Sequence, residues 1–367
     1  MIWHIWSIDL LISYNRMKDM SNKKKIITAA FGVIALRMAY PIFKNLYFLY
    51  FKPLYWNHLK FSKTLKQEIE SARKVRDSKV EFFECEEVVE VAEENDPQNR
   101  VSVRLMKSLE KKIIAGQRTN DPFLPPFDSG IFIMTLSKTH NLLFNKYMLA
   151  RNHLLIITRI FEAQTDPLTE SDLFETYSVM QVHEAFAFFN SDQRAGASQK
   201  HKHLQIIPYS SFDSHYLDLI HNTLKTEDEN ALEIFNELKL KFLRFPIFKD
   251  FKYCLAKFKA FDPYAESADD YRKYLMKIYL RCRLHLNIEN KAHSFNFLFG
   301  ENWMLLVLRK KEKYSNEVSL NSLAMLGSFL SCNPEKFEKI KSSNPSEIFK
   351  DILVQKDDEG EYFVIKE

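Results

Sequence analysis

Two histidines and a glutamine stand at alternate positions in the segment RAGASQKHKHLQIIP. Alternate side chains of a β-strand share one face, so a strand over residues 200–207 would place His201, His203 and Gln205 together. The opposite face would then carry Lys202, Leu204 and Ile206. Just before the histidines, Gly196 lies in a turn of small residues, whose backbone N–H groups could receive an anion. The pattern predicts a site that handles an anion.

The chemistry of this histidine pair is open to three interpretations. An H-x-H pair can offer two imidazoles to zinc, which needs a third protein ligand. The candidates for that ligand are not placed by the sequence: His140, His153, His183 and His215. Alternatively, both histidines are hydrogen-bonded structural residues. The third interpretation is nucleophilic phosphoryl or nucleotidyl transfer, because neutral imidazole is a good nucleophile near its pKa of ~6.5.

The third interpretation has requirements that this segment meets within about ten residues. A backbone carbonyl can hold the imidazole in one tautomer. Turn N–H groups can stabilise the charge that develops on a phosphoryl oxygen. The amide of Gln205 can donate to a non-bridging oxygen without titrating.

The elements that must position this segment follow from hydrophobic periodicity. Residues 141–147 and 154–158 are expected to be strands, the second buried on both faces. Thr169, with an acidic residue three positions later, resembles a capping box, and apolar residues at helical spacing predict an amphipathic helix over residues 170–184. Residues 186–190 are short enough for the strand that precedes the turn.

Strand and helix signals continue through the second half of the chain. Ser267 and Asp270 predict the start of another helix, and residues 295–299 and 303–308 predict an antiparallel pair of strands. Nearer the N-terminus, residues 80–94 alternate apolar and acidic side chains, as one solvent-edged strand or two short strands do, and residues 95–97 are expected to break the pattern. The mixture of helices and strands indicates the α+β class.

Length and composition restrict the class of protein. The chain has 367 residues, 46% of them hydrophobic, which is enough for one large domain or two ordinary ones. The 52 basic and 48 acidic residues give a formal net charge of +4, too balanced to indicate nucleic acid as the main partner. The four cysteines are scattered without a CxxC pair, which is typical of reduced thiols.

The N-terminal region differs from the rest of the chain. Residues 21–67 contain no Asp or Glu, and a run of three lysines precedes the apolar residues 26–36. That run is too short to span a bilayer. For residues 1–60 we consider a membrane contact, an acidic-poor organellar targeting segment and an extension without a fixed fold.

The segment GASQKHKHLQ resembles the active-site motif of the ATP adenylyltransferases, or diadenosine tetraphosphate phosphorylases. These enzymes are a branch of the histidine-triad superfamily, which also contains galactose-1-phosphate uridylyltransferase. Three further blocks resemble the family: residues 142–173, 294–311 and 319–330. The likeness implies a histidine-triad-like antiparallel sheet with flanking helices, extended by a second, smaller α+β region. It divides the chain into an extension (1–60), a catalytic domain (61–215) and a region that completes the nucleotide site (216–367).

The resemblance also implies a two-step transfer of AMP. In the family the second histidine of the motif attacks the α-phosphorus of the dinucleotide, so His203 would be the nucleophile. ATP leaves, and phosphate then takes the AMP as ADP. His201 and Gln205 would orient the ring and the phosphoryl oxygens, and a glutamine at that place is the transferase pattern rather than the hydrolase pattern. The same likeness implies substrate-binding roles for Lys111, Asn145, Lys146, Asn190, Gly196, Ala197, Ser198, Gln199, Asn321, Ser322 and Leu323.

The resemblance therefore predicts an enzyme that phosphorolyses diadenosine tetraphosphate to ATP and ADP in the cytoplasm, or in an organelle or at a membrane if residues 1–60 direct it there. Its expected partners are a dinucleoside polyphosphate, ATP, ADP and phosphate, with Mg²⁺ or another divalent cation accompanying the nucleotide. We expect no organic cofactor, no protein-bound metal and no nucleic acid. A nucleotide hydrolase, another nucleotidyl transfer on the same scaffold and a silent nucleotide-binding protein are the alternatives.

Overall fold

The computed structural model describes residues 52–77, 85–107, 121–127, 130–262, 266–288 and 293–358. Its contacts divide the chain into two compact units, residues 1–60 with 263–265 and residues 61–262 with 266–367. The second unit holds every strand described below. The roles considered for residues 1–60 concern a region whose first 51 residues lie outside the described ones. Among the helices that are described, none combines the length and the apolar character needed to cross a membrane.

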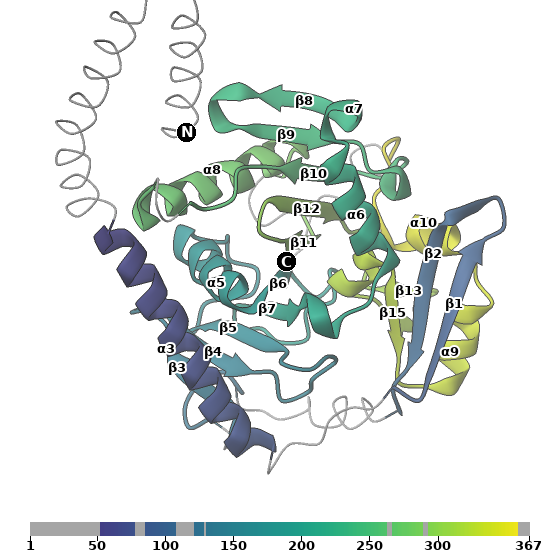
Figure 1. The fold of residues 1–367 in the computed structure, drawn as a ribbon. Helices are drawn as coiled ribbons and strands as arrows, with labels where there is room; N and C mark the ends of the chain where they lie inside the picture. Colours follow the sequence, from purple (N-terminus) through teal and green to yellow (C-terminus); the bar gives the residue numbers. More distant parts are fainter. Residues whose placement is uncertain are drawn as a thin grey trace, which may run out of the picture. The chain divides into compact units, whose positions relative to one another are not determined.

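The centre of the second unit is an antiparallel sheet of ten strands in the described residues (Figure 1). The strand order is β3-β4-β5-β7-β6-β11-β12-β10-β9-β8. The bounds are β3 Phe132–Thr135, β4 His140–Phe144, β5 Leu154–Thr158, β6 Ala185–Asn190, β7 His203–Pro208, β8 Ala231–Phe235, β9 Leu240–Leu243, β10 Tyr253–Lys257, β11 Phe295–Phe299 and β12 Trp303–Leu308. The region predicted at 61–215 supplies five of these strands and the region predicted at 216–367 the other five. They meet where β6 pairs with β11.

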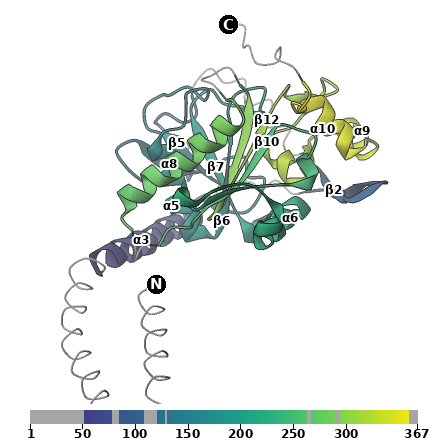
Figure 2. The same ribbon diagram turned by 90° about the horizontal axis from the view of Figure 1, so that it is seen from above.

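Helices cover both faces of this sheet, each over its own hydrophobic core (Figure 2). Under one face lie α5 (Glu170–His183), α8 (Ala268–His285) and, from Phe61 onward, α3 (Lys52–Asp77). The other face carries α6 (His215–Lys225) and the 3-10 turn η6 (Ser322–Leu326). The same core extends to α9 (Pro334–Lys341) and α10 (Pro345–Ile352), which pack against β2 (Asp96–Leu105) of a smaller sheet. Aliphatic and aromatic side chains together fill both cores, and full burial of one such side chain contributes on the order of 1.5–3 kcal/mol relative to exposure.

Smaller elements complete the described fold. A three-stranded sheet has the order β1-β2-β15, and β13 pairs with β14. Their bounds are β1 Glu87–Glu93, β2 Asp96–Leu105, β13 Lys313–Tyr314, β14 Val318–Ser319 and β15 Ser328–Ser331. The short helical turns are η3 Tyr209–Ser211, α7 Glu227–Asn230, η4 Asn236–Leu238 and η5 Pro246–Phe248.

Local sequence signals predicted several of these elements correctly. The Thr169 side chain accepts from the backbone N–H of Asp172, and the Asp172 carboxylate accepts from the N–H of Thr169, so the capping box that starts α5 is confirmed. Ser267 accepts from Asp270 N–H and starts α8 in the same way. The strand pair predicted at 295–299 and 303–308 has those bounds in the structure. The α+β class with flanking helices is confirmed.

Several strand boundaries differ from the prediction. The strand predicted at 141–147 ends at Phe144, because Asn145 Oδ1 accepts from the N–H of Tyr147 at 2.9 Å and turns the chain. The break predicted at 95–97 is confined to a turn at 94–95, and β2 already begins at Asp96. Pro97 is tolerated there because it lies at the start of the strand, where β15 does not yet pair with β2.

The boundary of the histidine strand matters most for the site. Continuous pairing was expected from residue 200, yet β7 begins at His203 and His201 forms only an isolated bridge with Ala163. Backbone hydrogen bonds join Lys200 and Lys202 to residues 162–164, the segment before α5, instead of to β6.

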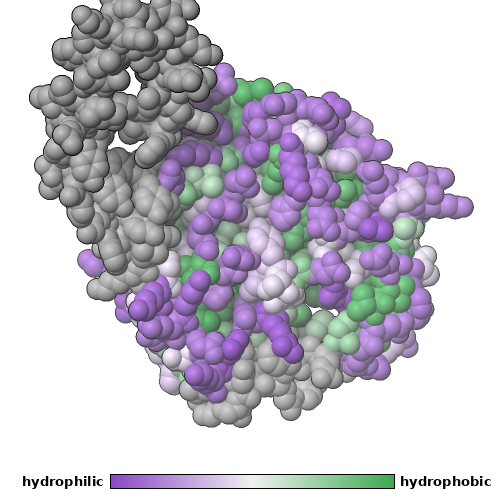
Figure 3. All heavy atoms as spheres, viewed as in Figure 1, coloured by the Kyte–Doolittle hydropathy of each residue, from purple (hydrophilic) through white to green (hydrophobic). Residues whose placement is uncertain are grey.

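Figure 3 shows that the outer surface in this view is mainly hydrophilic, with apolar side chains in small groups rather than one broad patch.

Candidate functional site

The two faces of β7 are occupied as the alternation predicted. Leu204 and Ile206 are buried in the core beneath α5. On the opposite face, the Phe123 ring lies 5.1 Å from the His203 ring and 5.9 Å from the His201 ring, measured between centroids. Both histidines therefore share one face, under a loop that precedes β3.

The hydrogen bond of His203 fixes which ring nitrogen can react. Its Nδ1 lies 2.8 Å from the backbone oxygen of His201. A carbonyl oxygen only accepts, so Nδ1 carries the proton and Nε2 keeps its lone pair. The ring is 4% exposed, and its orientation is set by a backbone group rather than by a mobile side chain. A neutral imidazole held in this way can act as a nucleophile at Nε2.

His201 is itself fixed at both ring nitrogens. Nδ1 lies 2.7 Å from Asp121 Oδ2, and Nε2 lies 2.9 Å from the backbone oxygen of Thr158. Nε2 also lies 2.8 Å from Thr158 Oγ1, so groups on both sides of the ring fix its orientation. Because His201 is held, so is the carbonyl that orients His203. Sequence reasoning missed Asp121, which lies 80 positions before His201.

A buried histidine, His153, links Gln205 to Asn145, another residue that was predicted to belong to the site. His153 Nε2 lies 3.0 Å from Gln205 Oε1, and Asn145 Nδ2 lies 3.3 Å from the same nitrogen. His153 is fully buried. Lys146 is half-buried beside Asn145 in the loop after β4. The structure therefore brings Gln205 and the Asn145 loop to one place.

Of the histidines considered as zinc ligands, His140 and His215 have other partners, as His153 does. His140 Nε2 lies 2.8 Å from Asp172 Oδ1, and His215 Nε2 lies 3.1 Å from the backbone oxygen of Gln98. Throughout the described part of the chain, no three His, Cys, Asp or Glu side chains are grouped to hold a metal ion.

The small-residue turn offers fewer N–H groups than the sequence suggested. Gly196 N–H donates to Gln193 O at 2.9 Å, and Ala197 N–H donates to Asp192 O at 2.9 Å, so both are used within the turn. The N–H groups of Ser198 and Gln199 enter no hydrogen bond with the described residues. These two are the donors that could receive a phosphoryl oxygen.

Gly196 is required where the turn meets the C-terminal region. Its φ is +90°, and a Cβ atom there would lie 2.8 Å from Asn321 Cα. Asn321 caps η6 by accepting from Leu323 N–H at 3.0 Å. The side chain of Leu323 is buried in the hydrophobic core. Gly196 and Asn321 are therefore neighbours, whereas the Leu323 side chain is part of the hydrophobic core.

Asn190 is tied to the same region. Its Oδ1 accepts from Ser322 N–H at 3.0 Å, from Ser322 Oγ–H at 2.7 Å and from Asn296 Nδ2 at 2.9 Å. These bonds join the end of β6 to β11 and η6. The remaining predicted residue, Lys111, lies outside the described residues.

A buried arginine behind this network escaped the sequence reasoning. Arg309 is 2% exposed, and its Nη1 donates to Asn296 Oδ1 at 2.7 Å and to Leu320 O at 3.0 Å. Its Nη2 donates to the backbone oxygens of Lys311 and Glu312. Burial lowers the pKa of this guanidinium to about 9. A cation whose hydrogen-bond acceptors among the described residues are all carbonyl oxygens contributes a positive field that favours a nearby anion.

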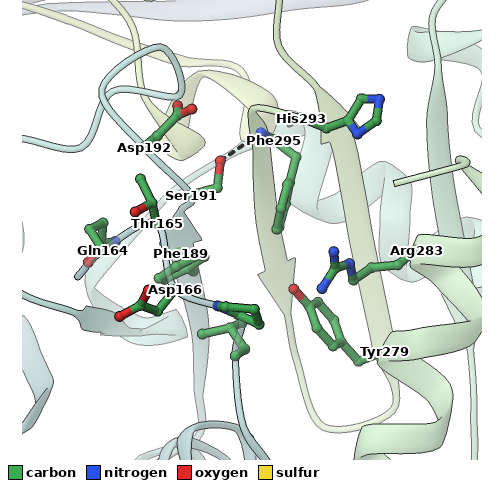
Figure 4. Close-up of a pocket in the computed structure, with 12 residues that line it drawn as sticks. Gln164, Thr165, Asp166, Phe189, Ser191, Asp192, Tyr279, Arg283, His293 and Phe295 are labelled. Atoms are coloured by element: carbon green, nitrogen blue, oxygen red, sulfur yellow. Dashed lines mark hydrogen bonds between the residues drawn. The ribbon is translucent and has the colours of Figure 1, made fainter. Parts of the chain in front are cut away.

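A small cavity adjoins the site on the α8 side of the sheet. It is lined by Gln164, Ser191, Asp192, Tyr279 and Arg283 among others, and Figure 4 shows these side chains around it. Its volume of about 20 Å³ suits roughly one water molecule. A nucleotide must therefore lie elsewhere, and the face that carries His203 is the one with the reactive groups.

An imidazole whose Nδ1 proton is held by a carbonyl, preceded along the chain by turn N–H groups that can receive an anion, is typical of a nucleotidyltransferase site. Comparison with known proteins gives the same class. Residues 58–224 match the model of the Ap4A phosphorylase N-terminal domain, and residues 249–355 match that of the ATP adenylyltransferase C-terminal domain. The chain belongs to this family of ATP adenylyltransferases, or Ap4A (diadenosine tetraphosphate) phosphorylases.

Two relatives from Saccharomyces cerevisiae support the assignment. Protein APA1 is 29% identical over 237 residues, which are 60% of this chain and 69% of the relative. Diadenosine 5',5'''-P1,P4-tetraphosphate phosphorylase 2 is 26% identical over 264 residues, which are 64% of this chain and 76% of the relative. The crystal structure of yeast Ap4A phosphorylase Apa2 with AMP shares the fold, with a TM-score of 0.58 at 22% identity over 78% of this chain and 94% of Apa2.

Proposed function

We propose that this protein phosphorolyses diadenosine tetraphosphate to ATP and ADP through an AMP–His203 intermediate. The observation that carries the proposal is the bond between His203 Nδ1 and the His201 carbonyl, which leaves Nε2 as the nucleophilic atom. Family membership supports the substrate. A yeast relative bears the name of a diadenosine tetraphosphate phosphorylase, and a structure of Apa2 in complex with Ap4A shares the fold, with a TM-score of 0.57.

The first step transfers AMP to the protein. The lone pair of His203 Nε2 attacks the α-phosphorus, an N–P bond forms, and the P–O bond to the triphosphate breaks. Its electron pair leaves with ATP. The Nδ1 proton stays in place, and the His201 carbonyl that accepts it stabilises the positive charge that the ring gains. The N–H groups of Ser198 and Gln199 would face the oxygens of the transferred phosphoryl group.

The second step releases AMP to phosphate. An oxygen of inorganic phosphate attacks the same phosphorus, the N–P bond breaks and its electron pair returns to Nε2. The product is ADP, and His203 is again neutral. We keep a divalent cation such as Mg²⁺ in the proposal as a companion of the polyphosphate, held mainly by phosphate oxygens.

Turnover of labelled diadenosine tetraphosphate, with and without phosphate, tests the proposal. We expect equal amounts of ATP and ADP, formed far faster when phosphate is present. Labelled inorganic phosphate should appear in ADP alone. Equal rates of ATP and AMP release with and without phosphate would indicate a hydrolase. A rise in melting temperature with nucleotide but no turnover would indicate a binding protein, and either result rejects the proposal.

A further inference from the structure

The ladder between β6 and β7 stops short of the nucleophile. Its last regular pair is Phe188 with Gln205, and two residues further along each strand Asn190 and His203 would stand opposite each other. They do not pair. The side-chain amide of Gln164 lies between them: His203 N–H donates to Gln164 Oε1 at 2.9 Å, and Gln164 Nε2 donates to Asn190 O at 2.7 Å.

Gln164 is held firmly in this position. Its backbone N–H donates to Lys200 O at 2.7 Å, and the preceding residue, Ala163, forms the isolated bridge with His201. Its residue surface is 3% exposed. The side-chain amide therefore behaves like an inserted peptide group, with both its donor and its acceptor bonded to the backbone of the two parted strands.

This insertion separates the strands without leaving unpaired groups. A buried N–H or C=O that loses its partner is destabilising, so without the amide the strands would tend to close on each other. Closure would bring the backbones of Asn190 and His203 into direct pairing. Because residues 190 and 203 stand opposite each other in this register, their side chains project from the same face.

We propose that Gln164 is a positioning residue that keeps the sheet open, so that a phosphoryl group fits between His203 and the elements tied to Asn190, namely the turn 196–199 and Ser322. Gln164 contacts only backbone atoms of His203 and Asn190 and takes no part in bond making. The inference rests on the proposed function, because it assigns the opening to the reacting phosphoryl group.

Gln164→Glu tests this role through pH. The ionised carboxylate still accepts from His203 N–H but has no hydrogen for Asn190 O, whereas the protonated acid restores both bonds. At pH 8 we expect kcat to fall about 100-fold while KM stays within about threefold, since the nucleophile shifts but nucleotide contacts remain. As the pH falls to about 5.5, the ratio of variant to wild-type kcat should rise toward one.

Gln164→Leu provides the non-titrating companion, and its kcat ratio should stay low at every pH. Tyr253→Phe is the matched control, because the Tyr253 hydroxyl oxygen accepts from the buried N–H of Phe245 at 2.7 Å in the same sheet. That control should lower the melting temperature and leave kcat and the pH profile unchanged.

The result that overturns the proposal is a Gln164 variant whose kcat stays within about twofold of wild type. A ratio for Gln164→Glu that does not change with pH overturns it as well. Both results are read against wild-type turnover of diadenosine tetraphosphate in the same assay. Absence of that turnover would reject the proposed function itself, which keeps the two failures distinct.

Discussion

The two faces of the segment 201–206, which leads into β7 and forms its first part, put alternate residues to different uses. On the reactive face the polar bonds orient rings, from Asp121 through His201 to His203. On the buried face Lys202, 1% exposed, places its Nζ 2.5 Å from Glu162 Oε2 and 3.5 Å from Asp172 Oδ2. One face holds the proposed nucleophile, His203, in a defined tautomer, and the other anchors the segment to α5. The comparison predicts that substitutions on the two faces separate activity from stability.

His203→Asn should have the largest effect on activity. Removing the nucleophile is expected to reduce phosphorolysis by about 10⁴-fold or more, since covalent transfer is no longer possible. Its free energy of unfolding, measured in urea, should stay within about 1 kcal/mol of wild type, because loss of the hydrogen bond to the His201 carbonyl costs about that much. Substantial residual turnover would show that another group carries the AMP.

Lys202→Met should reverse this pattern. It leaves the Asp172 carboxylate buried without its cation, and breaking a buried pair in this way costs about 3 kcal/mol in the free energy of unfolding. Per folded molecule, kcat should fall less than for His203→Asn. Comparison of urea midpoints and kcat for the two variants checks this, and equal losses of stability would remove the distinction between the faces.

The helix behind the buried face should make stability depend on pH. At the end of α5, burial and then the Lys66 charge lower the pKa of His183 to about 4. In the unfolded chain the His183 ring titrates at ~6.5. Its full contribution to the free energy of unfolding is therefore present above that pH and is lost as the pH falls from 6.5 toward 4. We expect a loss of about 2 kcal/mol over this window. His183→Gln should lack that loss, and an unchanged pH profile would contradict it.

Asp172 should act in a separate and lower pH range. Its burial raises the pKa, but the hydrogen bond from His140 and the charge of Lys202 outweigh this, so the net pKa lies below the ordinary 3.8. Its stabilisation is present above the unfolded value and is lost only as the pH falls below it. The two windows can therefore be separated in one titration of the free energy of unfolding.

Asp121→Asn should have the smallest effect and act on the reactive face alone. The amide oxygen that replaces the carboxylate can still accept from His201, but the acceptor is then uncharged. Hydrogen bonds between neutral groups are roughly half as strong as those with an ionised partner. We expect kcat to fall about tenfold with stability within about 1 kcal/mol of wild type. Steady-state kinetics beside a thermal melt measures both, and a fall in stability without a change in kcat would place Asp121 outside the catalytic arrangement.

Local spacing was enough to predict the alternation in β7, the capping box of α5 and the β11–β12 pair, because each depends on residues a few positions apart. The supports of the site were not predictable in this way. Gln164 lies 39 positions before His203, and no periodicity marks it. Asp121 and Arg309 are likewise brought to the site only by packing of distant segments. The predicted substrate-binding roles of Asn145, Asn190, Asn321 and the turn stay predictions.

The most direct test of the central claim is to trap the intermediate. The protein is mixed with diadenosine tetraphosphate labelled at the α-phosphorus, without inorganic phosphate, and quenched in alkali, where a phosphoramidate survives. We predict about one labelled AMP per chain, labile to acid, on the peptide that contains His203, and its conversion to ADP when phosphate is added. An unlabelled wild-type protein that still turns over substrate, or equal labelling of His203→Asn, would contradict the account.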